Sequence, residues 1–169
     1  MSIRRSILPA LVALAASGCS EGTGLVAPDP LFGVVGGPSR VTGSGHVQQA
    51  AGRREFTFHA TAGEGGGADG SFKVVLPNGL FVESDVTCLS VAGNTGWVGG
   101  TIRATNAANV VVGSRSWFFA IDGAEGEGTT DLVSLVVFNG AAGGELAFCQ
   151  NQPVALPTLT VTDGNVQVH

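Results

Sequence analysis

The sequence predicts an all-β domain, an antiparallel meander of about eight or nine strands in a closed or nearly closed barrel, with a β-sandwich as the alternative. Two patterns carry this prediction. From Arg40 onward, apolar residues alternate with polar ones or form β-branched runs, and Gly, Asn and Asp separate these runs. No stretch there repeats apolar residues at the helical period, and 27 glycines with 12% charged residues fit many short strands and turns.

The first residues have the layout of a secretory signal peptide. Arg4 and Arg5 precede an apolar run over residues 7–16, which is too short to span a bilayer as a helix. The small residues that lead to Cys19 resemble the bacterial lipobox, although Ala16 stands where leucine is commoner. The resemblance implies cleavage before Cys19 and acylation of this cysteine with palmitate-type chains; an ordinary signal peptide with an incidental cysteine is the alternative. We therefore expect residues 1–18 to be a lipoprotein signal peptide.

Residues 19–39 are expected to hold the lipidated cysteine and a Gly/Pro-rich tether, in which three prolines prevent regular pairing. Two or more acyl chains anchor a protein stably where a single chain does not. Ser20 rather than Asp follows Cys19, and the resemblance to Gram-negative lipoproteins then implies passage to the outer membrane. The first expected partner is therefore the membrane, bound through the N-terminal lipid, with the domain facing the periplasm or the cell surface.

Residues 40–169 are expected to form a single all-β domain. Alternation in the second strand puts Phe56, Phe58 and Ala60 on one face. Pairing of Gly164–His169 with Val41–Val47 would close the barrel and remove its exposed edges. Loops are expected at residues 63–70, 77–79, 92–95, 106–113 and 123–130. The expected strands, in order, are Arg40–Val47, Arg53–Thr61, Phe72–Leu76, Leu80–Val91, Gly96–Thr105, Arg115–Asp122, Leu132–Phe138, Glu145–Cys149 and Leu159–Val168.

The charge balance excludes some classes of partner. Eight basic and thirteen acidic residues give a formal charge of −5. Nucleic acid requires basic residues that neutralise phosphates, so we expect no nucleic-acid partner. The same acidic composition argues against electrostatic adhesion to anionic lipid.

Four segments of the chain form a recognisable set: VTGSGHV (41–47), SDVTCLSVAGNTGWVGG (84–100), FAIDGAEGEGTTDLVSLVVF (119–138) and GNVQVH (164–169). Together they resemble a family of secreted bacterial β-domains of the post-COAP type. The resemblance covers nearly all of residues 40–169 and implies an all-β architecture, but it implies no activity. The family has Asp-Asn-Gly-Glu where this chain has Asp-Gly-Ala-Glu from Asp122 to Glu125.

Cys88 and Cys149 are the cysteines that remain once Cys19 is lipidated. An even pair in an exported domain most simply forms a disulfide. The alternatives are buried thiols or a cysteine-based site, but no Cys-x-x-Cys motif and no neighbouring histidine accompanies either residue.

One glycine-rich loop carries four carboxylates, Asp122, Glu125, Glu127 and Asp131. Hard cations prefer several oxygen ligands on a flexible loop, which makes this loop a weak candidate for Ca²⁺. Its spacing matches no EF-hand or nonapeptide repeat, so an ordinary acidic turn is favoured and no metal site is expected.

No catalytic constellation stands out, so we expect neither an enzyme nor a cofactor. Pairing of the first and last strands would allow His46 and His169 to be neighbours, but two exposed strand-end histidines are the favoured interpretation. An enzyme would need a cleft in which His59, Glu55 or Asp85 meets another titratable group. Trp97, Trp117 and the phenylalanines are expected to be core rather than pocket residues.

The sequence thus favours a non-enzymatic, envelope-anchored lipoprotein whose β-barrel domain has a structural or interaction role. The alternative is a calycin-like carrier that holds a small apolar ligand in the barrel. The volume of the core distinguishes the two, because bulky residues that fill the barrel leave no room for a ligand. The expected partners are correspondingly an envelope protein or a small apolar ligand.

Overall fold

The computed structural model describes residues 38–63, 67–123 and 130–169. Within these ranges the chain forms nine strands and one short helix, which belong to one compact unit. The elements are β1 (Arg40–Gln49), β2 (Gly52–Ala62), β3 (Ala68–Val75), β4 (Phe81–Ala92), β5 (Thr95–Thr105), β6 (Arg115–Ile121), β7 (Leu132–Ser134), β8 (Val137–Gly140), α1 (Gly144–Asn151) and β9 (Thr158–Val168).

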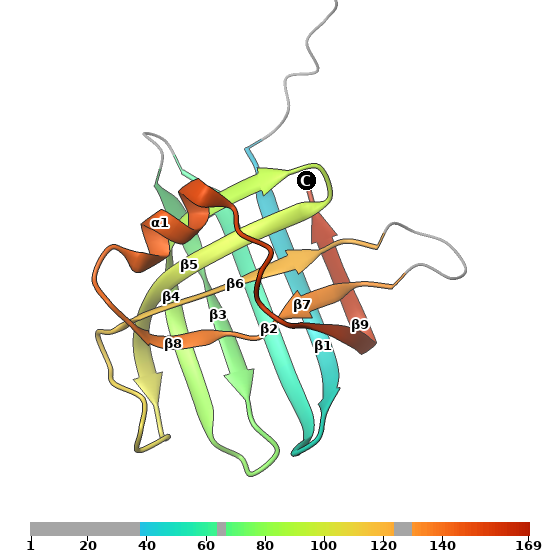
Figure 1. Cartoon of the computed structure of the whole chain (residues 1–169), viewed down its shortest axis with the longest axis vertical. Coiled ribbons are helices and arrows are strands. Elements are labelled where there is room, and N and C mark those ends of the chain that lie inside the picture. The colour runs from blue at the N-terminus through green and yellow to red at the C-terminus, as the bar shows by residue number, and fades with distance from the viewer. Residues whose placement is uncertain (1–37, 64–66, 124–129) are drawn as a thin grey trace, which may run out of the picture. The chain divides into compact units, whose positions relative to one another are not determined.

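Eight of the strands close into an antiparallel barrel, which confirms the predicted fold class (Figure 1). Each of β1 to β6 pairs with the next strand along the chain, β7 joins β6 to β9, and β9 pairs with β1. The register of the last pair runs from Val41 opposite Val168 to Val47 opposite Val161. The first and last strands therefore close the barrel as the sequence predicts, with a bulge where His46 and Val47 face Asp163 and Val161.

The interior of the barrel is filled by the inward residues of every strand. Alternation on β2 predicts its inward face correctly, because Phe56, Phe58 and Ala60 are each at most 7% exposed. Gly43 is needed opposite Phe58, since a β-carbon there would overlap the aromatic ring of Phe58. The buried interior cluster consists of Val41, Val47, Phe56, Phe58, Ala60, Phe72, Val86, Val98, Phe118, Ala120, Val133 and Val166.

Helix α1 replaces the short strand that the sequence predicts at Glu145–Cys149. Its buried residues Glu145, Phe148 and Cys149 follow the helical spacing of three and four residues. The helix lies against the outer face of β4, β5 and β6 (Figure 1). There Phe148 completes a second buried cluster with Trp97 and Phe119, so these aromatic residues are core residues outside the barrel.

Two further strand predictions need correction. The expected strand Leu132–Phe138 is interrupted, because the Ser134 hydroxyl accepts the Phe119 amide (2.9 Å) and the Leu135 amide donates to Pro157 (2.9 Å). The Ser134 side chain thus replaces a backbone carbonyl as the acceptor for an amide of β6, and the strand divides into β7 and β8. In addition, residues 68–70 of the expected loop 63–70 belong to β3.

Candidate functional site

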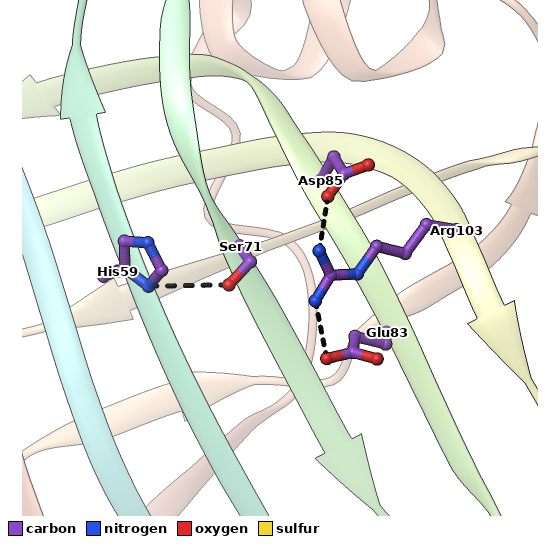
Figure 2. Close-up of polar contacts among 5 residues, drawn as sticks. All are labelled: His59, Ser71, Glu83, Asp85 and Arg103. Atoms are coloured by element: carbon purple, nitrogen blue, oxygen red, sulfur yellow. Dashed lines mark hydrogen bonds and ion pairs between the residues drawn. The ribbon is translucent and has the colours of Figure 1, made fainter.

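The outer face of β2, β3 and β4 carries His59, Ser71 and Asp85 in one row across the sheet (Figure 2). The Ser71 hydroxyl lies 3.5 Å from His59 Nδ1. A catalytic triad places histidine between the nucleophile and the carboxylate, whereas here serine is the middle residue. The row therefore lacks a carboxylate that would orient the imidazole, and His59 and Asp85 are exposed on the barrel surface rather than in a cleft.

Arg103 on β5 fixes the carboxylate of Asp85 instead. Its guanidinium donates to Asp85 Oδ1 at 3.0 Å and to Glu83 Oε1 at 2.7 Å (Figure 2). The hydrogen bond from Arg103 lowers the pKa of Glu83, and the same bond raises the pKa of Arg103. Both carboxylates thus bind the same arginine, which suits a structural bridge between β4 and β5.

Cys88 on β4 and Cys149 on α1 form the predicted disulfide, with their Cα atoms 6.3 Å apart. The bond holds the helix against the barrel, whereas the sequence predicts a link between two strands. Gly99 permits this contact, because a β-carbon there would lie 2.7 Å from Cys88 Sγ and 2.8 Å from the Glu145 side chain. Gly99 and Gly100 stand opposite Cys88 and Val86, so they flank the β4 bulge at Thr87.

In the loop that is the weak calcium candidate, the carboxylates of the two described residues, Asp122 and Asp131, accept hydrogen bonds from backbone amides. Asp131 accepts from the amides of Gly123 (2.8 Å) and Val166 (2.7 Å), and Asp122 accepts from the amide of Val168 (3.1 Å). Glu125 and Glu127 lie outside the described residues. Within the described ranges, no group of three or more metal-ligating side chains is found.

His46 and His169 are not neighbours, although their strands do pair. His169 lies opposite Arg40, while His46 lies opposite Asp163, six residues farther along β1. At about 3.3 Å per residue, this offset separates the two imidazoles by about 20 Å. His46 Nδ1 instead lies 3.7 Å from Asp163, which also binds Arg53 at 2.6 Å.

One end of the barrel interior opens to the surface, and we call this opening the mouth. It leaves about 30 Å³ for a molecule the size of water, which is room for about two waters. Ser84 on β4 and Ser116 on β6 are buried but do not line the mouth, and their hydroxyls are hydrogen-bonded to each other at 2.9 Å. The lining of the mouth is mainly apolar and includes Val47, Phe56, Val74, Val136 and Leu159, together with Arg54.

The sequence patterns do not single out two charged residues that face inward or are buried, Arg54 and Glu145. Arg54 precedes Phe56 by two residues, so the alternation on β2 already places it on the inner face. Glu145 is 3% exposed and pairs with Arg115, whose Nε lies 3.2 Å from Oε1. Glu145 Oε2 has no hydrogen-bond partner among the described residues. No local sequence signal identifies Glu145, because Arg115 is 30 residues earlier.

Comparisons with family models, curated proteins and solved structures each returned no match. Over the residues that the structure describes, no helix is long and apolar enough to cross a membrane. Cys19 and the tether, on which the lipoprotein prediction depends, lie outside the described residues.

Proposed function

We propose that this protein is a non-enzymatic lipoprotein, anchored to the outer membrane through Cys19, whose barrel has a structural or interaction role. The observation that carries the proposal is the filled interior. Rings of Phe56, Phe58, Phe72 and Phe118 occupy the space that a carrier keeps for its ligand. The domain is then expected to act through its surface and not through an enclosed ligand.

The polar face supports the non-enzymatic part of the proposal. The order of His59, Ser71 and Asp85 across the strands does not provide a base that is oriented by a carboxylate. Arg103 neutralises the two carboxylates beside this row. The lipobox-like segment before Cys19 supports the anchor, and the Gly/Pro-rich tether supports a domain that is held away from the membrane.

Metabolic labelling with an alkyne analogue of palmitate tests the anchor. The wild-type protein should carry the label in the outer-membrane fraction, and Cys19→Ser should lose it. A double variant, Cys88→Ser with Cys149→Ser, serves as the control and should keep the label. A wild-type protein without label, or with label in the inner membrane alone, would contradict the proposal.

Native mass spectrometry of protein purified from its own envelope tests the interior. We expect the mass of the processed chain with its acyl groups and the intact disulfide. An apolar ligand retained in stoichiometric amount would instead support the carrier alternative.

A further inference from the structure

Arg54 is an inward-facing arginine at the apolar mouth of the barrel. It stands two residues before Phe56 and four before Phe58 on the inner face of β2. Val47 lies opposite it on β1, and the turn at Leu76–Asn78 lies beside it. A cationic group is thus placed at the edge of a hollow lined by valine, leucine and phenylalanine side chains.

The guanidinium of Arg54 has no ion pair or hydrogen bond within the described parts of the chain, and its buried Nε lacks a partner. Burial lowers the pKa of this group. A partly desolvated cation gains strongly from an anion that both neutralises it and accepts its hydrogen bonds. The other arginine of the pair, Arg53, faces outward and is already bound to Asp163.

Arg54 is not neutralised by the other charged residues along the mouth, of which only Glu55 is an anion. Glu55 and Lys73 contribute to the lining, but their side chains belong to the outer face of the barrel. Glu55 is exposed, and the Lys73 amine lies 5.2 Å from the ring centre of Phe81.

We propose that the mouth binds a short-chain fatty carboxylate, with the carboxylate on Arg54 and the apolar chain over Val47, Phe56, Val136 and Leu159. The space of about 30 Å³ excludes a long chain that would extend into the barrel. A short chain that covers the opening instead buries apolar surface on both sides.

The polar groups at the mouth favour a plain carboxylate over the C-terminus of a peptide. The Ser134 hydroxyl in the lining is already used, since it accepts from the Phe119 amide and donates to the Leu135 carbonyl at 3.2 Å. A peptide amide beside the carboxylate would therefore find no free acceptor on Ser134. The occupant that fits is charged at one end and apolar elsewhere.

The site is separate from lipid attachment, so its test uses the full chain with Cys19→Ser, in which no acyl chain can compete. Hexanoate is titrated into the ¹⁵N-labelled protein, and amide shifts are followed by NMR. We expect saturable shifts at Val47, Phe56 and Val136. Hexan-1-ol, which has the same chain without the charge, should bind at least about tenfold more weakly.

Two variants locate the binding. Arg54→Met keeps an apolar side chain but removes the charge, and should weaken hexanoate binding by at least about tenfold. Arg53→Met, the neighbouring outward arginine, is the matched control and should change the affinity less than about twofold. Val136→Phe, which reduces the opening and leaves Arg54 in place, should also weaken binding while the spectrum stays dispersed.

Three results would overturn the proposal. These are equal binding of hexanoate and hexan-1-ol, equal effects of Arg54→Met and Arg53→Met, and tighter binding of N-acetyl-leucine than of hexanoate, which would indicate a peptide C-terminus. The ligand should exchange freely and be lost on purification. Its detection by titration is therefore distinct from the retained ligand that would contradict the proposed function.

Discussion

At the scale of single residues, two aspartates take the place of a missing strand. The C-terminal half of β9 pairs with β1 along one edge, while β7 reaches only residues 158–160 on the other edge. Beyond that point, Asp131 binds the amide of Val166 and Asp122 binds the amide of Val168. Side-chain carboxylates thus satisfy backbone donors that a longer β7 would satisfy in a regular sheet.

Asp131→Asn should destabilise the protein by about 1–3 kcal/mol. The carboxylate accepts two amides, from Gly123 and Val166, whereas asparagine offers one acceptor and turns an NH₂ group toward the second donor. Chemical denaturation at neutral pH measures the change. Asp163→Asn is the control, because its ion pair with Arg53 is largely exposed and should contribute less than about 1 kcal/mol. Equal effects of the two substitutions would contradict this role of Asp131.

At the scale of elements, α1 is attached to the barrel by both covalent and apolar contacts. The disulfide joins its last turn to β4, and Trp117 stacks on Phe148 with their ring centres 6.0 Å apart. The indole of Trp97 donates to the carbonyl of Pro153, just beyond the helix, at 2.9 Å. The helix therefore covers aromatic residues that a bare barrel would expose to water.

Replacement of Cys88 and Cys149 together by serine should lower the free energy of unfolding by up to about 4 kcal/mol in the chain-entropy description. The cysteines are 61 residues apart, and a loop of that length restricts the unfolded chain considerably. Denaturation with and without a reductant gives the measurement. Reductant should destabilise the wild-type protein and leave the double variant unchanged. An equal response of both proteins would show that the disulfide does not restrain the unfolded chain.

The bridge between β4 and β5 should respond to acid. Because Arg103 lowers the pKa of Glu83 below its ordinary value of 4.5, the ionised carboxylate stabilises the folded state at neutral pH. That contribution is present above the unfolded pKa and is lost as the pH falls through the lower folded value. An NMR titration of the Glu83 side chain should give a higher pKa in Arg103→Met than in the wild type. An unchanged pKa would contradict the bridge.

The strands could be predicted from the sequence because an inward residue every second position leaves a visible alternation, as on β2. Helix α1 could not, because a charged residue, Glu145, occupies one of its buried positions and obscures the helical period. The division of β7 from β8 depends on the Ser134 hydroxyl, which acts across the sheet on Phe119. The disulfide was predictable because Cys88 and Cys149 are the pair that remains when Cys19 is assigned to the lipid anchor. Arg54 was visible in the alternation, but its lack of a partner depends on the folded structure.

At the scale of the whole molecule, closure depends on the two ends of the domain. Arg40 and His169 exchange backbone hydrogen bonds of 2.9 and 2.8 Å. By the alternation of an antiparallel pair, the amides of Thr42 and Ser44 then point toward β9, and those of Val41 and Gly43 point toward β2.

Hydrogen exchange should find these two sets of amides protected to a similar degree, since neither edge of β1 is free. Deletion of residues 165–169 should accelerate exchange at Thr42 and Ser44 far more than at Val41 and Gly43. Rapid exchange of the β9-facing set in the intact protein would mean that the barrel is open in solution.

Because Arg40 and His169 are hydrogen-bonded neighbours, the domain could be circularly permuted: the strands would follow one another in a different order along the chain but keep the same neighbours in the barrel. A short linker could join these residues, and new ends could be opened at the exposed turn Pro77–Gly79, without changing which strands are neighbours. Such a circular permutant would still form the same barrel, but its ends would lie beside the mouth. A reporter fused there would sense what happens at Arg54, which makes the domain a candidate scaffold for a sensor of small carboxylates.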